Sequence, residues 1–449
     1  MKKIHFYCIF LFVLLGSFSS VFGQLTANRA GKLDTSFAGQ GYAGLPVPDG
    51  MFVVTETHAK APDGKVVVVS NNTGFETALH RVLANGELDQ SFGSGGYVTI
   101  ETEIGGRNSP ALAIQSDGKI LVGGFKGVVS SGQWIVDSYV VRLNTDGSID
   151  TDFGNNGWVV RDLSAPGELS NDRYEAAFIK PNSKILLVGL SDRYASPGRT
   201  RTYLTLTQLN SDGSLDASFA QNGVSMVEIG NGESDRLMSG TVKARLLRSG
   251  KVAILISQKV FESPKSQNYQ YFTKLFRFEE NGQIDVGFSQ NGSQSFSTGQ
   301  FIWPPCGFDE DSEGNLYFVL PSSGTLRKLK PNGESDQTFG FGGIIHLFFW
   351  TPSDLAVGRD GKIILMGRDR DVIAGNPNQY RSALRRYYPD GSLDIKFGQQ
   401  GSAFFAFGSN EFRKLLVDDD GSFLISGYYY PTQNRTAPFI ARVVASRKP

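Results

Sequence analysis

One motif, Asp-x-x-Phe-x-x-x-Gly, recurs seven times along the 449-residue chain and constrains the fold more than any other feature. Its aspartates stand 51 to 69 residues apart. An identical block at unequal spacing indicates a constant structural frame that carries connections of variable length. The repeated aspartates are Asp34, Asp89, Asp150, Asp216, Asp285, Asp336 and Asp394.

Two turn signals in each unit predict β-hairpins. An Asn-Gly or Asp-Gly pair, first Asn85-Gly86, precedes all but the first of the seven blocks. A second turn, such as Asp117-Gly118-Lys119, precedes a short hydrophobic run. Such pairs accept the positive φ angles that two-residue hairpins require. In the second unit we expect four strands, over residues 97–100, 111–115, 119–123 and 139–143.

Seven units of four short strands predict an all-β protein, a seven-bladed β-propeller with four antiparallel strands per blade. A linear β-solenoid is the alternative. The chain begins with a strand at 41–45 and ends with one at 439–444, so we predict that 41–45 joins the C-terminal blade and closes the ring. The repeat units run over residues 31–86, 87–147, 148–213, 214–282, 283–333, 334–391 and 392–449.

A basic residue recurs at one position of the frame, five residues before the hairpin glycine. We predict a structural Arg–Asp pair in each blade, with Arg442 pairing Asp34 across the closure. A basic ring for an anionic ligand is the alternative. The arginines are Arg81, Arg142, Arg277, Arg386 and Arg442, with Gln208 and Lys328 at the equivalent place in two units.

The N-terminus has the pattern of a secretory signal peptide. Lys2 and Lys3 precede an apolar run over residues 4–15, and small residues lead to Gly23. We expect cleavage after Gly23, with an uncleaved membrane anchor as the alternative. Residues 24–449 then form a single exported domain with no transmembrane helix, secreted, periplasmic or on the cell surface. Cys306 is its one cysteine, so no internal disulfide is expected.

The order of these motifs resembles the delta-60 repeat family, secreted or surface repeat proteins of bacteria. The second unit carries the resemblance in Gly86–Gly93, Asp117–Lys119 and Val141–Asn144. The strand arrangement is also similar to the NHL-type propeller repeat. The resemblance spans residues 31–449 and implies architecture, export and a broad binding role. It supplies no catalytic residues.

The connections of variable length are the expected binding region. Forty-four basic and 44 acidic residues leave no basic field for nucleic acid. The variable connections, residues 101–110, 161–175, 190–202, 228–243 and 257–270, are expected on one face around the channel mouth. Arginine and aromatic side chains anchor interfaces and stack on sugars, whereas packing between blades is the alternative role for the tryptophans. The candidate ligand-binding residues are Arg107, Arg173, Tyr174, Arg236, Trp303, Trp350 and Arg413.

The sequence carries no recognisable catalytic or metal motif. There is no Gly-x-Ser-x-Gly, and Cys306 has no activating motif around it. The acidic runs 309–313 and 418–420 resemble fragments of calcium loops without the glutamate expected at position twelve. We therefore expect no cofactor, with calcium as the alternative.

Together these patterns predict an exported, monomeric binding module that recognises an extracellular protein or glycan through its variable-loop face. One alternative is a secreted hydrolase or lyase acting on a polysaccharide with acidic residues at the channel mouth. The other is a structural surface or matrix module.

Overall fold

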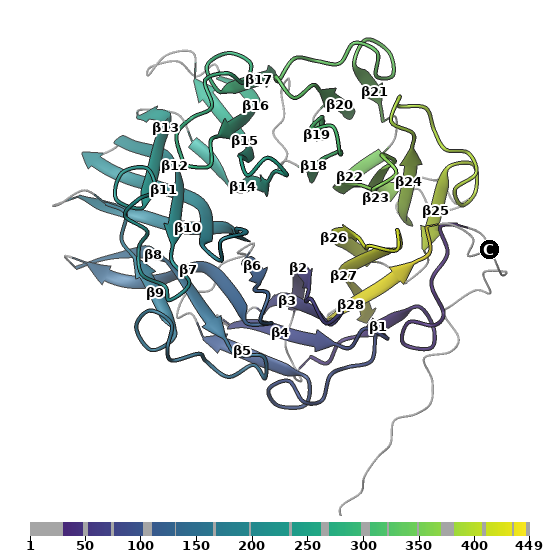
Figure 1. Cartoon of the computed structure of the whole chain (residues 1–449), viewed down its shortest axis with the longest axis horizontal. Helices are drawn as coiled ribbons and strands as arrows, with labels where there is room; N and C mark the ends of the chain where they lie inside the picture. Colours follow the sequence, from purple (N-terminus) through teal and green to yellow (C-terminus); the bar gives the residue numbers. More distant parts are fainter. Residues whose placement is uncertain are drawn as a thin grey trace, which may run out of the picture.

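The computed structural model is a closed ring of small β-sheets around a central axis (Figure 1). It describes residues 30–47, 53–72, 76–101, 110–130, 132–164, 168–196, 199–232, 236–261, 269–297, 306–320, 323–347, 350–369, 381–405, 410–432 and 435–445. The signal peptide predicted over 1–23 lies outside these residues. None of the described segments forms a helix with the length and apolar character needed to cross a membrane.

The described residues form 28 strands, which make seven blades of four. The first blade holds β2 (Val53–Lys60), β3 (Val66–Asn72), β4 (Glu76–Val82) and β5 (Tyr97–Glu101). The second holds β6 (Ala111–Ile114), β7 (Ile120–Ser130), β8 (Gln133–Leu143) and β9 (Trp158–Arg161). The third holds β10 (Leu169–Ile179), β11 (Ile185–Ser196), β12 (Arg199–Leu209) and β13 (Val224–Gly232).

The remaining blades repeat the same order. The fourth holds β14 (Arg236–Leu246), β15 (Val252–Phe261), β16 (Tyr269–Phe278) and β17 (Ser293–Ser297). The fifth holds β18 (Phe308–Glu310), β19 (Leu316–Leu320), β20 (Thr325–Leu329) and β21 (Ile344–His346). The sixth holds β22 (Trp350–Val357), β23 (Ile363–Asp369), β24 (Arg381–Tyr387) and β25 (Ser402–Phe405). The seventh holds β26 (Asn410–Val417), β27 (Phe423–Thr432), β28 (Arg435–Val443) and β1 (Tyr42–Gly44).

The first strand of each blade lies innermost and the fourth outermost (Figure 1). The second and third blades are continuous as one eight-stranded sheet, because Asn171 of β10 pairs in parallel with Val136 of β8. Pairing within each blade is antiparallel, which confirms the predicted fold class.

The ring closes as predicted. β1 pairs antiparallel with β28, Tyr42 opposite Ala441 and Gly44 opposite Phe439. Each repeat unit therefore gives its first strand to the preceding blade, so sequence units and blades are offset by one strand. The offset ties the two ends of the chain together and leaves no open blade edge at the closure.

The core lies between blades rather than within them. Seven hydrophobic clusters each join two consecutive blades. Alternate residues of the second strand of a blade pack against the blades on its two sides. In the first blade, Val66 and Val68 pack toward the seventh blade, and Val67 and Val69 pack toward the second. Because both faces of the sheet are buried, the second strand is hydrophobic at successive positions instead of alternating.

The repeated block is the joint between neighbouring blades. Its phenylalanine is buried in all seven units. Phe37 packs so closely on Gly86 of the next hairpin that an added Cβ there would lie 2.6 Å from the ring, and Gly86 has φ +87°. The residue after the phenylalanine, Ala38, donates its amide to the carbonyl of Asn85. The Asn-Gly pair is thus required by contact with the neighbouring blade as well as by the turn.

Candidate functional site

The predicted Arg–Asp positions form a buried ring of ion pairs inside the frame. Side-chain nitrogen to oxygen distances are 2.8 Å for Arg81–Asp89, 2.6 Å for Arg142–Asp150, 2.5 Å for Arg277–Asp285, 3.0 Å for Lys328–Asp336 and 2.8 Å for Arg386–Asp394. Gln208 donates to Asp216 at 2.6 Å. At the closure, Arg442 Nε lies 3.7 Å from Asp34 Oδ2, and Arg442 Nη2 pairs with Asp420 Oδ2 at 2.5 Å.

Each arginine of this ring has several partners. Arg81 pairs with Asp89, stacks over Phe92 with its guanidinium carbon 4.5 Å from the ring centroid, and donates to the Thr145 carbonyl of the next blade. The other oxygen of Asp89 accepts the Ser91 amide and hydroxyl. Since each guanidinium nitrogen of Arg81 has a partner within the frame, this geometry supports a structural role for the ring.

The hairpins between the second and third strands are longer than predicted. Residues 190–202 belong mostly to β11 and β12, which pair continuously from Ile185–Leu209 to Tyr194–Thr200. The 228–243 segment, which connects the third blade to the fourth, is likewise largely strand, in β13 and β14. Residues 257–261 and 269–270 belong to β15 and β16, and 262–268 lie outside the described residues. Treating 190–202 and 228–243 as loops was wrong, because cross-strand pairing extends well beyond the hydrophobic core. These hairpins stand on the face away from the Asp-Gly-Lys turns.

Two of the hairpins, in the second and third blades, expose large apolar side chains. Trp134 of β8 is 72% exposed and lies opposite Val129 of β7, which is 62% exposed. Tyr194 of β11 is 43% exposed, and its hydroxyl accepts the Asn171 side-chain amide at 2.5 Å. Neither Trp134 nor Tyr194 was a candidate from the sequence. The Ser-Gly pair at 131–132 of the sequence, a dipeptide typical of turns, was the signal that could have predicted this hairpin.

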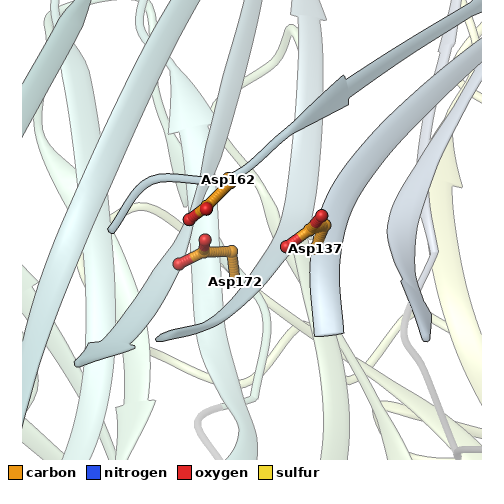
Figure 2. A group of neighbouring side chains, drawn as sticks. All are labelled: Asp137, Asp162 and Asp172. Carbon is orange, nitrogen blue, oxygen red and sulfur yellow. The ribbon is translucent and has the colours of Figure 1, made fainter. Parts of the chain in front are cut away.

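A group of three carboxylates lies at the seam between these same blades (Figure 2). Asp137 is on β8, Asp162 directly follows β9, and Asp172 is on β10. One oxygen from each lies within 4.8 Å of the other two. No other group of three metal-binding side chains of this kind occurs among the described residues.

Hydrogen bonds hold two of the three carboxylates in place. Asp172 Oδ2 accepts the Leu163 amide at 2.7 Å and the Ser170 hydroxyl at 2.8 Å. Asp162 Oδ1 accepts the Ser164 amide at 2.8 Å. Both aspartates therefore fix the connection from β9 to β10, which carries the chain from one blade to the next.

The group is electrostatically unfavourable as it stands. Burial, reinforced by the charges of Asp162 and Asp172, raises the pKa of Asp137 to about 6, and Lys126 opposes the shift. Burial also raises the pKa of Asp172. Carboxylates gathered in this way repel one another and favour either a proton or a cation.

The predicted ligand-binding residues do not form one cluster. Tyr174 is fully buried in the core between the second and third blades, so the prediction of a rim position for it was wrong. Arg173 is held by Asp192 at 2.8 Å and Glu175 at 3.2 Å. Arg236 begins β14 and Trp350 begins β22. Arg107 and Trp303 lie outside the described residues.

Arg413 belongs to a different group, on the innermost strand of the seventh blade. Its guanidinium carbon is 5.4 Å from the centroid of the Tyr428 ring. Glu411 pairs with Arg413 at 3.4 Å and with Arg368 of the sixth blade. Arg413 stands at a β-bulge of β26, a feature that turns a side chain out of the regular alternation.

The two acidic runs that resemble calcium-loop fragments use their oxygens internally. Asp309 pairs with Arg245 at 2.5 Å and accepts the Val357 amide of the next blade at 2.8 Å. Asp311 accepts two amides of its own turn and the Tyr317 hydroxyl. Asp420 forms an ion pair with Arg442. Their geometry favours fold stabilisation over ion binding.

Cys306 has the environment of a packing residue. Its thiol is buried and donates to the Pro352 carbonyl at 2.9 Å. Burial raises the pKa of this thiol to about 12, so the thiolate required of a nucleophile is not formed near neutral pH.

Comparison with known proteins identifies the repeat but not an activity. Residues 61–92, 115–153, 180–219 and 358–397 match a domain of unknown function, DUF5122, described as a beta-propeller. Each segment runs from the first turn of a blade to the phenylalanine of the repeated block. No curated protein matches the sequence.

Several solved structures are similar over most of their length. The polysaccharide lyase Uly1 has a TM-score of 0.50 at 13% identity and covers 90% of this chain and 91% of its own. A Dyadobacter fermentans protein of unknown function scores 0.48 at 9% identity, covering 90% and 98%. Virginiamycin B lyase from Staphylococcus aureus scores 0.46 at 10% identity, covering 89% and 98%. At such identities the likeness to Uly1 shows the propeller fold alone.

Proposed function

We propose that this chain is an exported binding module that recognises an extracellular glycan or protein with the hairpins of its second and third blades. Trp134, Val129 and Tyr194 carry the proposal, because they are exposed large apolar side chains on long hairpins that the core does not need. Exposed aromatic side chains of this kind mark interaction sites, and their rings stack on sugars or fill a partner's pockets. The delta-60 resemblance and the signal-peptide pattern support export.

The composition of the surroundings favours a glycan as the first ligand class to test. Beside the Tyr194 ring stands the Asn171 side-chain amide, which donates to the Tyr194 hydroxyl. A ring for stacking and polar groups for hydroxyls are the two features that a sugar site combines.

The test is a binding screen with polysaccharides and glycans on the protein expressed with its own N-terminal segment. Trp134→Ala should weaken binding at least about tenfold, the loss typical of an interface anchor. Phe341→Ala is the matched control: Phe341 is 91% exposed but lies in a repeated block, away from the hairpin tips. Equal loss in both variants, or no effect of Trp134→Ala, would contradict the proposal.

If no glycan binds, the proposed ligand would be a protein instead. Protein partners would then be sought with the wild-type protein, with Trp134→Ala as the negative control. Failure of both screens would favour a purely structural surface or matrix module.

The carboxylate group favours a second candidate, a secreted hydrolase or lyase acting on a polysaccharide. Asp137, protonated near pH 6 beside two further carboxyl groups, has the pairing of proton donor and carboxylate that glycoside cleavage uses. Release of reducing ends or unsaturated products by the protein, abolished in Asp137→Asn, would favour this candidate. Binding without turnover would favour the module.

A further inference from the structure

We infer that Asp137, Asp162 and Asp172 form a binding site for one divalent cation, with calcium the preferred class, at the seam between the second and third blades. This inference stands on the seam's own geometry and does not depend on the proposed ligand of the hairpin face.

The spacing of the carboxylate oxygens fits calcium. Calcium binds oxygen ligands at about 2.4 Å, so two oxygens on one ion lie at most about 4.8 Å apart. One oxygen from each of the three aspartates meets this limit with respect to the other two. Calcium also accepts about six to eight oxygen ligands in flexible geometry, whereas magnesium demands a near-ideal octahedron.

The charge of the group has no ion-paired counterpart among the described residues. Several other buried aspartates have a basic partner, as Asp89, Asp150 and Asp285 do within 3 Å. Among the described residues, neither Asp137, Asp162 nor Asp172 forms an ion pair with a lysine or arginine. Lys126 acts on Asp137 only at longer range. A cation from solution would supply the missing charge.

An independent observation points into the same place. Ser191 of β11 is fully buried and lies directly opposite Asp172 in the β10–β11 register, so the two side chains leave the sheet on one face. The Ser191 hydroxyl acts on the Asp172 carboxylate and lowers its pKa, but it makes no hydrogen bond of regular geometry with any described residue. Neither does Oδ1 of Asp172 or of Asp137. Buried polar oxygens are rarely left without a partner, and an ion with its bound waters would satisfy them.

A bound cation would join elements that the chain connects only through one loop. Asp137 and Asp162 belong to the third strand and outer edge of the second blade, whereas Asp172 belongs to the innermost strand of the third (Figure 2). The Asn171–Val136 pair links these blades at the same level. The cation would therefore stabilise the seam that supports the exposed hairpins.

The experiment is a calcium titration of the full-length protein after chelator treatment. Calorimetry measures the heat of binding, and thermal unfolding measures the Tm. Saturating calcium should release or absorb heat at one site per chain and raise the Tm by roughly 2–4 °C or more. Asp137→Asn should abolish both effects. Asp419→Asn, an exposed aspartate paired with Arg359 in another blade, is the matched control and should retain both.

Misfolding is excluded by the calcium-free baseline. Because Asp137→Asn removes like-charge repulsion and Asp137 Oδ1 holds no hydrogen bond, this variant should unfold at or above the wild-type Tm in chelator. Absence of heat and of a Tm shift with calcium, magnesium and manganese at millimolar concentration would overturn the inference. A full calcium response in Asp137→Asn would also overturn it.

Discussion

At the scale of single residues, one blade shows how the frame tolerates the loss of its arginine. Gln208 replaces arginine in the third blade, and Lys180 lies where it compensates. The Lys180 ammonium donates to Gln208 Oε1 at 3.0 Å and stands 5.9 Å from the centroid of Phe219. A cation therefore remains near the Phe219 side chain and Asp216, although it comes from a different strand.

This exchange should be transferable to the second blade. Arg142→Gln removes the partner 2.6 Å from the buried Asp150 and should lower the free energy of unfolding by about 2 kcal/mol, since Lys119 still pairs with that carboxylate. Gln115 is the equivalent of Lys180 in the second blade, because the backbone amide of each donates to the carbonyl of the lysine four residues later. Adding Gln115→Lys should restore a large part of the stability.

Urea unfolding of the wild type, the single variants and the double variant measures this coupling as a double-mutant cycle. The single variant Gln115→Lys, which places a second cation beside Arg142, serves as the reference for the added charge. Additive losses in the double variant would show that Lys180 does not replace the arginine.

At the scale of elements, closure depends on a strand of three residues. β1 supplies the outer strand of the seventh blade and continues the frame, because the Asp34 amide bonds to the Arg442 carbonyl and the Arg442 amide to Gly41. The same two bonds link Arg81 with Asp89 and Gly96 at the outer edge of the first blade. The closure is therefore a normal joint of the ring, although its ion pair is longer and more exposed than the others.

Ala43→Pro should open this joint. The bonds of Gly41 with Arg442 and of Leu45 with Pro438 place Ala43 at a hydrogen-bonded position of the ladder, where proline supplies no donor. We expect a loss of about 3 kcal/mol and an exposed β28 edge that promotes association. Thermal unfolding and size-exclusion chromatography test this, with Ala43→Ser as control; an unchanged Tm would show that closure contributes little.

At the scale of the whole molecule, the seam between the last and first blades has its own chemistry. His58 of β2 is buried, and its Nδ1 lies 2.7 Å from the Ser426 hydroxyl of β27. Thr436 bonds to both the amide and the carbonyl of Val53. His80 is also buried and bonds to the Pro46 carbonyl behind β1. Two neutral histidines therefore stand at the closure of the ring.

Acid should weaken this seam before the others. Burial, with Lys414 adding to it and Asp354 opposing it, lowers the pKa of His58 to about 3, and burial lowers that of His80 to about 4. Because the unfolded value is about 6.5, the unfolded chain binds the protons, and stability present above pH 6.5 is lost as pH falls toward these values. Between pH 7 and pH 5 each histidine should cost about 2 kcal/mol.

Urea unfolding at pH 7 and pH 5 checks this expectation. His58→Gln keeps a polar partner for Ser426 without a titrating ring. Between pH 7 and pH 5 this variant should therefore lose less free energy of unfolding than the wild type, by the contribution of one histidine. Hydrogen exchange should locate the early opening in β1, β2 and β28. An identical pH dependence of the two proteins would contradict the assignment.

The frame could be predicted from the sequence because its signals are local. Hairpin pairs such as Asn85-Gly86 and the Asp-x-x-Phe block act within a few residues, and their sevenfold repetition determined the blade number and the closing strand. The Arg–Asp positions followed from the same regular spacing. In each case one unit contains the partners, or the adjacent unit supplies them at a constant offset.

The candidate site was decided by tertiary structure. Asp137, Asp162 and Asp172 are separated along the chain and meet only where two blades pack, so no spacing rule predicts their approach. Trp134 is exposed because its hairpin outgrows the core, whereas Tyr174, expected at the rim, is buried because its strand alternates toward the neighbouring blade. The sequence by itself determined the repeating frame, since turns and strand periods are local; the folded ring alone determined which side chains meet at its seams or reach its surface.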